Sequence, residues 1–250
     1  MLIQVLETLN NSMEQQLQAL VDESNGYEPY YNCGYPHVVA FADNSSILIG
    51  LLSFLPDEQD GSRKAELSAL VATSYRQNGI FTAMLEKIRP VLKEYGIAET
   101  YCALPEYMLA SDIHSGILYT EYLMQLNQEA YLSLANTENV SPDDTTNLEF
   151  YFSDDQCTYM GYLPDGDEPV CVCSLDYEPS FTNVHGVYVD EKLRHCGIGT
   201  LLMNNLIKDY FEDETLPLIL NVSSTNAAAV KLYKKCGFTE ASHISYYIIA

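Results

Sequence analysis

The sequence predicts an α/β fold made of two similar halves, and two observations carry this prediction. Each half contains a pair of apolar runs separated by turn-forming residues, at 37–54 and 157–177, which is the pattern of a β-hairpin. In each half a further apolar run leads through a glycine-bearing turn into a segment with helical spacing, at 67–85 and 184–203. The same succession of strands and helices is therefore expected twice.

The elements of the first half follow in order along the chain. Residues 1–20 predict an amphipathic helix, because leucine and valine recur on one side of it. The polar residues 43–46 supply the turn of the first hairpin. Apolar residues recur at helical spacing after Phe81, but we expect Pro90 to kink or end that helix early, because proline lacks a backbone N–H.

The elements of the second half have clearer boundaries. Residues 164–167 (Pro-Asp-Gly-Asp) supply the hairpin turn. After Gly199 an apolar side chain recurs every fourth residue, which predicts a helix with one apolar face. Residues 218–222 predict a short buried strand, and 226–238 predict a helix that a glycine closes.

Matching residues indicate an internal duplication. Arg76 and Arg194 occupy equivalent points, and Tyr119 and Tyr233 follow them at similar distances, each after a leucine in a stretch that is expected to be helical. The polar, turn-rich segment 136–147 predicts a linker. We expect the second copy to be intact and the first to be degenerate. The predicted domains are 1–135 and 147–250.

Composition narrows the range of partners. The formal charge of -23 disfavours non-specific nucleic-acid binding and fits a cationic small molecule or basic peptide, although acidity also keeps a cytosolic protein in solution. No apolar run is long enough to cross a membrane, and the chain begins without a secretory signal pattern. The seven cysteines lack zinc-site spacing, so we predict no metal, reduced thiols and a cytoplasmic protein.

The loop at 194–199 (Arg-His-Cys-Gly-Ile-Gly) predicts a phosphate cradle. A strand ends near Val189, a short polar turn follows, and two glycines open a helix whose first N–H groups are unpaired and attract anions. The chain has no Gly-x-x-x-x-Gly-Lys-Ser/Thr string, and Leu202 stands where a dinucleotide fingerprint needs its third glycine. Both of those nucleotide loops are therefore excluded.

The loop resembles the pyrophosphate motif Gln/Arg-x-x-Gly-x-Gly/Ala of the GNAT superfamily of acetyl-coenzyme A-dependent N-acetyltransferases. A second motif of that family, Asn-x-x-Ala-x-x-Leu-Tyr-x-x-x-Gly-Phe, is similar to residues 226–238. The residues that fill its named places are Asn226, Ala229, Leu232, Tyr233, Gly237 and Phe238. The resemblance covers about the last hundred residues and implies a tandem GNAT fold, α/β (α+β), in which each half is a mixed, mostly antiparallel sheet flanked by helices.

The resemblance also implies an acyltransferase that moves an acetyl group from acetyl-coenzyme A to a primary amine of a small molecule or peptide. Backbone groups of Val187 and Val189 would pair with the pantetheine arm, and amides from His195 to Thr200 would hold the pyrophosphate. Tyr233 would protonate the departing thiolate. The implied cofactor-binding set is Val187, Tyr188, Val189, Arg194, His195, Cys196, Gly197, Ile198, Gly199, Thr200, Asn221, Asn226 and Tyr233.

The general base stays open at this point. Asn183 occupies the register where many family members carry a glutamate, and His185, Asp176 and Glu178 are the nearby alternatives. A non-catalytic module that binds coenzyme A or regulates a partner is therefore the alternative function.

The first half departs from the family pattern. The loop at 76–81 resembles the same cradle, but Phe81 replaces its last small residue. Glu66 lies one place away from the register of the base in some members, while Asp112 and Tyr119 hold the places of Asn226 and Tyr233. The Gly-Phe pair is replaced by Leu123 and Met124.

Overall fold

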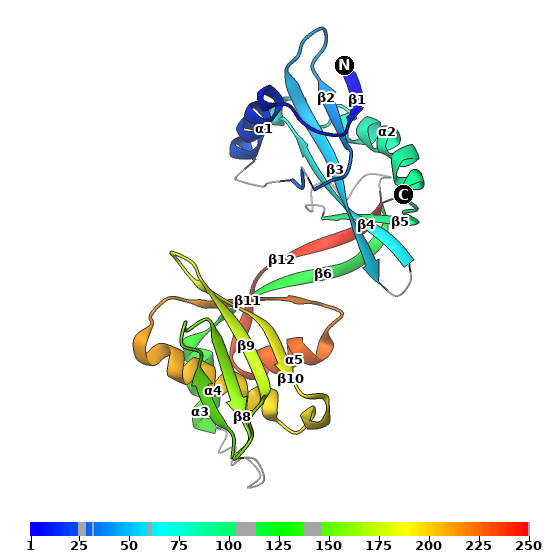
Figure 1. Ribbon diagram of the computed structural model, residues 1–250. Helices are drawn as coiled ribbons and strands as arrows, with labels where there is room; N and C mark the ends of the chain where they lie inside the picture. The colour runs from blue at the N-terminus through cyan, green and yellow to red at the C-terminus, as the bar shows by residue number, and fades with distance from the viewer. Residues whose placement is uncertain (25–28, 32, 60–61, 104–113, 138–146, 250) are drawn as a thin grey trace. The chain divides into compact units, whose positions relative to one another are not determined.

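The computed structural model describes residues 1–24, 29–31, 33–59, 62–103, 114–137 and 147–249 (Figure 1). The chain divides into two compact units, of which the first comprises Met1–Leu118 and Ser245–Ala250 and the second comprises Tyr119–Ile244. These bounds differ from the predicted domains 1–135 and 147–250. Most of the predicted linker at 136–147 lies outside the described residues.

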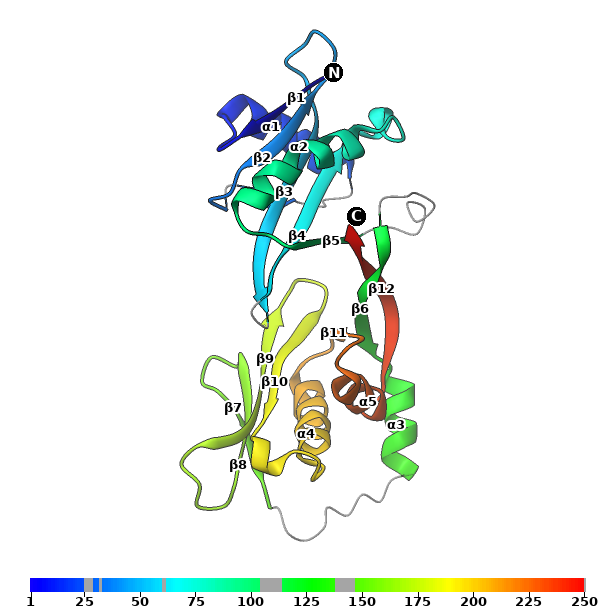
Figure 2. The same ribbon diagram turned by 90° about the vertical axis from the view of Figure 1, so that its right-hand side faces the viewer.

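In the first unit, helices pack on both faces of a sheet (Figure 2). The strand order is β1-β2-β3-β4-β5-β12, and all neighbours are antiparallel except β4 and β5. Gly50 faces Met84 of α2, whereas α1 contacts β3 and β4 from the opposite face. The elements are β1 (Leu2–Leu6), α1 (Asn11–Glu23), β2 (His37–Phe41), β3 (Leu48–Gln59), β4 (Ser62–Val71), a 3₁₀ turn (Thr73–Tyr75), α2 (Ile80–Glu94) and β5 (Glu99–Ala103).

The second unit repeats this order with one omission. Its strands run β6-β11-β10-β9-β8-β7, and only β10 and β11 are parallel. No helix of the described residues separates β7 from β8, where α1 stands in the first unit. The elements are β6 (His114–Leu126), α3 (Gln128–Thr137), β7 (Glu149–Phe152), β8 (Thr158–Tyr162), β9 (Pro169–Tyr177), β10 (Thr182–Val189), a 3₁₀ turn (Glu191–Leu193), α4 (Ile198–Asp213), β11 (Leu218–Ser223), α5 (Ala227–Lys235) and β12 (Phe238–Ile249).

The last strand of each half pairs with the fifth strand of the other half's sheet. The end of β12 lies antiparallel to β5, with Tyr247 opposite Cys102. In the second unit β6 lies antiparallel to β11, with Met124 opposite Leu220. This exchange explains why the compact units do not follow the sequence halves: a strand belongs to the sheet that satisfies its backbone hydrogen bonds.

Each unit has its own apolar core. In the first, Leu17 of α1 and Met84 of α2 are buried against the sheet. In the second, Leu202 and Leu206 of α4 are fully buried against β8–β10, as the period of four predicts. Burial of this kind is the main driving force for folding, at about 25 cal/mol per Å² of apolar surface.

The N-terminal helix prediction was wrong for its first residues. Residues 2–6 form strand β1, and α1 begins only after Asn10, whose side chain accepts a hydrogen bond from the Met13 N–H at 3.0 Å. Asparagine is a strong helix-capping residue, so it sets the start of the helix. Before it, pairing with β2 outweighs the weak local helical pattern.

Two further helix predictions were wrong. Helix α2 continues through Pro90 to Glu94, because Pro90 and Glu86 lie on the exposed side where water can satisfy the freed carbonyl. Tyr119 lies in strand β6, not in a helix. The segment around it is rich in β-branched and aromatic residues, and β11 supplies the ladder partner. The match of Tyr119 to Tyr233 therefore does not hold.

Candidate functional site

The candidate site begins where β10 and β11 separate. The two strands pair only through Thr182 with Leu218 and through Asn183 with Ile219. Beyond this point β10 continues to Val189 and β11 continues to Ser223, but the two strands no longer pair with each other. A gap between parallel strands leaves backbone donors and acceptors on both sides available to an extended ligand.

A β-bulge changes the direction of the side chains at the end of β10. The pairing register with β9 shifts between His185 and Tyr188, and Gly186 lies between them with φ of +60°, a conformation that favours glycine. Beyond the bulge the Tyr188 side chain is 47% exposed, and the Arg194 guanidinium lies 5.8 Å from the centre of its ring.

The loop after β10 presents a row of unpaired N–H groups. His195 and Gly197 adopt left-handed conformations, with φ of +63° and +86°. The backbone N–H groups from His195 to Gly199 make no hydrogen bond to any described residue, whereas the Thr200 N–H donates to the Gly197 carbonyl at 3.0 Å. Residues 195–197 are exposed, Ile198 is buried and Gly199 is half-buried, and the run leads into the N-terminus of α4, where the helix dipole favours an anion.

Arg194 holds the loop against the strand. Its Nε donates to the Val189 carbonyl at 3.0 Å, and its guanidinium lies 3.5 Å from the Glu191 carboxylate. The Val189 carbonyl therefore already accepts one hydrogen bond within the protein. Sequence reasoning missed this contact, although the same five-residue spacing recurs at Val71 and Arg76 and could have indicated it.

Gly199 is confined by α5. A Cβ atom at this position would lie 3.1 Å from Leu232 Cδ2 and 3.8 Å from Val189 Cγ2. By contrast, a Cβ at Gly197 would meet nothing within 4 Å, so it is the backbone conformation there that requires glycine. The two glycines of the motif thus serve different purposes.

The second motif forms α5 as predicted. The Asn226 side chain caps the helix by accepting from the Ala229 N–H at 3.1 Å, and Gly237, with φ of +89°, closes it. Phe238 then turns into the core, 6.1 Å from the ring of Tyr233. Asn221 is exposed on β11.

Tyr233 is a buried phenol. Its side chain is 7% exposed and its hydroxyl makes no hydrogen bond to any described residue. Burial, followed by the neighbouring thiols of Cys173 and Cys236, raises the pKa of Tyr233 to about 12. The hydroxyl therefore keeps its proton throughout the physiological pH range.

Three polar groups gather on the face of the sheet opposite α4. The Asn183 Oδ1 is buried and has no hydrogen-bond partner among the described residues. His185 Nε2 lies 3.2 Å from Asp176 Oδ2 on the neighbouring strand, and both side chains are exposed. Glu178 lies in the turn after β9, where its N–H donates to the Phe181 carbonyl. Only His185 and Asp176 of the candidate bases are in contact.

The first unit contains a loop with the same backbone conformation. Gln77 and Gly79 are left-handed, with φ of +62° and +72°, and Arg76 Nε donates to the Val71 carbonyl at 2.9 Å. Phe81 stands where the second unit has Gly199 and packs against the first core. Asp112 lies outside the described residues.

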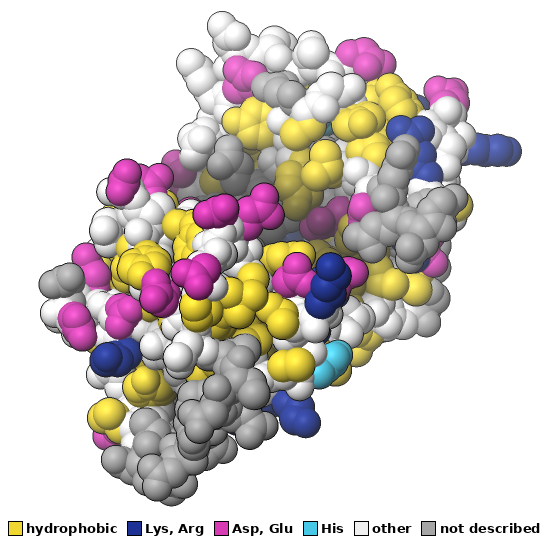
Figure 3. Space-filling model, turned by 60° about the horizontal axis from the view of Figure 1, so that its bottom comes forward, with side chains coloured by type: hydrophobic (Ala, Val, Ile, Leu, Met, Phe, Trp, Pro, Cys, Tyr) yellow, Lys and Arg dark blue, Asp and Glu magenta, His cyan; other side chains and the backbone are white. Residues whose placement is uncertain are grey.

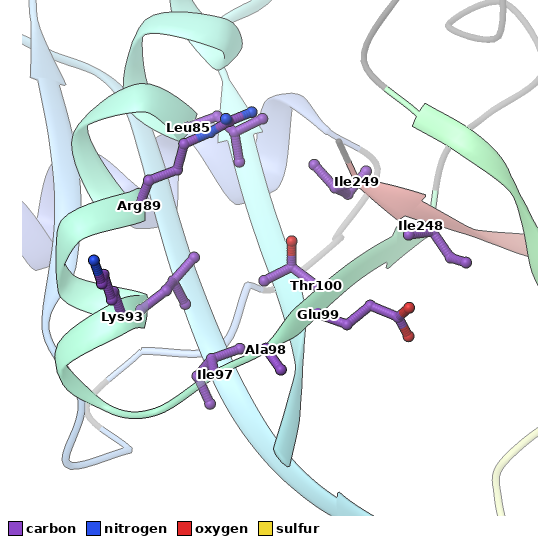
Figure 4. Close-up of a pocket in the computed structure, with 10 residues that line it drawn as sticks. Leu85, Arg89, Lys93, Ile97, Ala98, Glu99, Thr100, Ile248 and Ile249 are labelled. Carbon is purple, nitrogen blue, oxygen red and sulfur yellow. The ribbon is translucent and has the colours of Figure 1, made fainter. Parts of the chain in front are cut away.

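A separate cavity of about 370 Å³ lies near the end of α2 (Figure 4). Apolar side chains form most of its wall, with Arg89 and Lys93 from α2 and Glu99 from β5. Within the described parts of the chain, no three His, Cys, Asp or Glu side chains are placed to share a metal ion, and no helix is long and apolar enough to cross a membrane.

Comparison with known proteins finds similarity to one family of transferases over the second half of the chain. Residues 120–238 match the model of the acetyltransferase (GNAT) family. N-alpha-acetyltransferase 30 of Xenopus laevis is 22% identical over 168 residues, which are 66% of this chain and 62% of that protein. The chain thus matches less than two thirds of the length of that relative.

Solved structures match over nearly the whole chain. A tandem GNAT protein from the clavulanic acid biosynthesis pathway is 14% identical, covers 99% of this chain and 98% of its own, and has a TM-score of 0.64. A GCN5-related N-acetyltransferase from Sphaerobacter thermophilus is 11% identical, covers 98% and 95%, and has a TM-score of 0.59. At these identities the likeness shows the fold. The chain has the mixed α/β fold of these GNAT proteins, and its residues 120–238 are similar to the acetyltransferase (GNAT) family.

Proposed function

We propose that the second unit transfers an acetyl group from acetyl-coenzyme A to a primary amine of a small molecule or peptide. The observation that carries this proposal is the run of unpaired N–H groups from His195 to Gly199 beside the gap between β10 and β11. Donors that the protein leaves unsatisfied at a helix N-terminus fit a pyrophosphate, and the gap fits an extended arm.

The charges of the loop support the same ligand. Lys192 and Arg194 are exposed beside the donors, in a chain with only 12 lysines and arginines, and the Arg194 guanidinium lies 3.5 Å from the Glu191 carboxylate. Local cations in an acidic protein attract a phosphorylated ligand to this point. Acetyl-coenzyme A would supply the acetyl group as a thioester, and the residues of this chain would bind it and move protons.

Tyr233 is suited to give a proton to a departing thiolate. The raised pKa keeps its hydroxyl protonated, and no described residue takes up that hydroxyl as a hydrogen-bond partner. A general acid must hold its proton until the leaving group needs it. Asn226 is engaged as the helix cap, and its amide N–H groups can still donate to a ligand.

We assign the role of proton acceptor for the amine to His185. Its Nε2 faces Asp176, which leaves Nδ1 as the ring nitrogen that can accept a proton. Asp176 would orient the ring and stabilise the imidazolium, as a carboxylate does beside a histidine base. Asn183, which replaces the glutamate of many family members, has no basic group to offer.

The acceptor is expected to be cationic. Acidic side chains stand among the hydrophobic ones across the face shown in Figure 3, and lysines and arginines are few there. An ammonium group gains from such a field, whereas a phosphorylated acceptor would be repelled. The relative named an N-alpha-acetyltransferase makes a peptide α-amine one candidate of this class.

Titration of acetyl-coenzyme A into the full chain by calorimetry tests the proposal. We expect one binding site per chain, and release of free thiol when a primary amine is added. His185→Gln should lower kcat by about 10²-fold and leave acetyl-coenzyme A binding unchanged, because general base catalysis contributes about 10²–10⁴. Absence of binding would refute the proposal.

A non-catalytic coenzyme A-binding module is the second candidate. The observation in its favour is Asn183, an amide at the place where a carboxylate base is common, with its Oδ1 buried and unpaired. This function predicts binding of acetyl-coenzyme A with the same rate of thiol release in the presence and absence of a broad panel of amines.

A further inference from the structure

The second unit exposes a row of apolar side chains that runs straight across its sheet. Tyr151 of β7 is paired with Met160 of β8, Met160 with Val172 of β9, and Val172 with Tyr188 of β10. Residues directly opposite on neighbouring strands share a face, so the four side chains form one continuous row. Tyr151 is 52% exposed, and the two central members are half-buried.

The inner positions of this row are covered in the first unit, where the exposed Gln4 of β1 holds the place of Tyr151. The arginine of each loop bonds the last residue of its strand, so Leu70 of β4 corresponds to Tyr188 and Leu51 of β3 corresponds to Val172. Leu51 and Leu70 are 0% and 3% exposed on the face that α1 contacts. In the first unit these positions therefore hold apolar side chains that a helix covers.

The second unit keeps the apolar side chains without the helix. A five-residue turn, 153–157, joins β7 to β8, and α4 covers the other face of β8–β10 (Figures 1 and 2). Exposed apolar side chains in a contiguous row favour a ligand that removes them from water. A surface that only faces water would not need the aromatic side chains that stand at both ends of the row.

The row adjoins the polar groups assigned to the chemistry. Thr158, Ser174 and His185 form the neighbouring cross-strand row on the same face. Asp176 and the Glu149 carboxylate, which accepts a hydrogen bond from the Tyr151 hydroxyl at 2.7 Å, place negative charge at two edges. Tyrosine faces also attract cations. The face thus offers apolar contact, negative charge and a base together.

We propose that this row, Tyr151–Met160–Val172–Tyr188, binds the non-reacting part of the acceptor, and that the acceptor is a cationic primary amine with an aromatic or bulky apolar group. This inference rests on the proposed function and adds the substrate class. The ammonium group lies toward His185 and Asp176, and the apolar group lies along the row. A small hydrophilic amine gains no such contact.

A matched pair of amines tests the inference with the full chain. We expect kcat/KM for 2-phenylethylamine to exceed that for ethylamine by about tenfold or more, the range that burial of one aromatic group provides. Tyr151→Ala should remove about fivefold of this preference through KM, with kcat and calorimetric acetyl-coenzyme A binding unchanged. Tyr177, at the end of β9 and outside the row, is also an exposed tyrosine, at 41% against 52% for Tyr151; Tyr177→Ala is therefore the control and should keep the preference.

Different results would contradict the proposed substrate class and the proposed acetyl transfer. Equal kcat/KM for the two amines, or a preference that Tyr151→Ala leaves intact, would overturn the substrate class while thiol release still supports acetyl transfer. A concentration-dependent dimer in sedimentation experiments that Tyr151→Ala dissociates would also overturn it, because a second copy would then occupy the row. Loss of acetyl-coenzyme A binding in the wild-type chain would instead count against the proposed function.

Discussion

The loops at 73–80 and 191–198 have the same backbone and differ in what surrounds them. Both begin with a 3₁₀ turn, place left-handed residues at the same two points, and use an arginine to bond the carbonyl five residues earlier. Local hydrogen bonds and dihedral preferences suffice to form this loop in both units. A cradle-shaped loop is not by itself a reason to expect a cofactor.

The surroundings differ at the position after the helix start. In the second unit Gly199 has no side chain, and Leu232 lies close to it. In the first unit the Phe81 side chain fills the equivalent place and packs against the first core. The gap between strands also differs, since four residue pairs join β4 to β5 and two join β10 to β11. From this comparison we propose that ligand binding needs space beside the loop, which Gly199 leaves and Phe81 does not.

The largest expected effect is the loss of kcat on Tyr233→Phe, a substitution in the second unit. Removal of the proton that the hydroxyl holds should lower kcat by about 10²–10⁴-fold, the usual contribution of a general acid. Acetyl-coenzyme A binding should change by less than about twofold, because the ring and its packing on Phe238 remain. Steady-state kinetics and calorimetry on the same sample measure both. Tyr119→Phe, in strand β6, is the matched control, and an unchanged rate in Tyr233→Phe would remove the assigned role.

Gly199→Phe gives the second loop the side chain that Phe81 provides beside the first loop. We expect acetyl-coenzyme A affinity to fall at least about tenfold, and thermal stability to fall as overpacking against Leu232 costs about 1–3 kcal/mol. Gly199→Ala keeps the fold testable, because its Cβ meets only the tip of a flexible side chain, and it should weaken binding less. Phe81→Leu in the first loop should leave calorimetric affinity as it is. Full binding by Gly199→Phe would show that the space beside the loop is not decisive.

Cys196 offers a footprint of the ligand on the second loop. All seven cysteines are thiols; Cys33, Cys157 and Cys196 are exposed and the other four are buried. With desulfo-coenzyme A at ten times its Kd, iodoacetamide should modify Cys196 about tenfold more slowly, because only free protein reacts. Peptide mass spectrometry follows each site separately, and Cys157 should react at its original rate. Equal slowing at both cysteines would indicate a general effect of the ligand.

The buried phenol gives the second unit a pH dependence of stability. The folded-state pKa of Tyr233, about 12, lies above the unfolded value of about 10, so the stabilisation is present below pH 10 and is lost as pH rises toward 12. Between pH 9 and pH 11 wild type should lose about 1.4 kcal/mol more free energy of unfolding than Tyr233→Phe. Urea unfolding at the two pH values measures this difference. Parallel losses in both proteins would contradict the burial-raised pKa.

The sequence alone determined the local elements of the second unit and predicted the residue types of its candidate site. The hairpin at 157–177, the strand before Arg194, the cap at Asn226 and the closing Gly237 all follow from short-range rules of periodicity, turn chemistry and helix capping. These rules work where the preferred local conformation and the native one agree. The fold class was predicted by resemblance and is confirmed by the structural neighbours.

Only the tertiary structure decided which segments became partners. Residues 2–6 and Tyr119 entered strands because β2 and β11 offered ladder partners, and local pattern cannot encode a partner far along the chain. The same holds for the exchange of β6 and β12, for the contact of His185 with Asp176, and for the exposed row on β7–β10. Each depends on strand register, which long-range pairing fixes: a shift of one residue would have turned every one of those side chains to the opposite face.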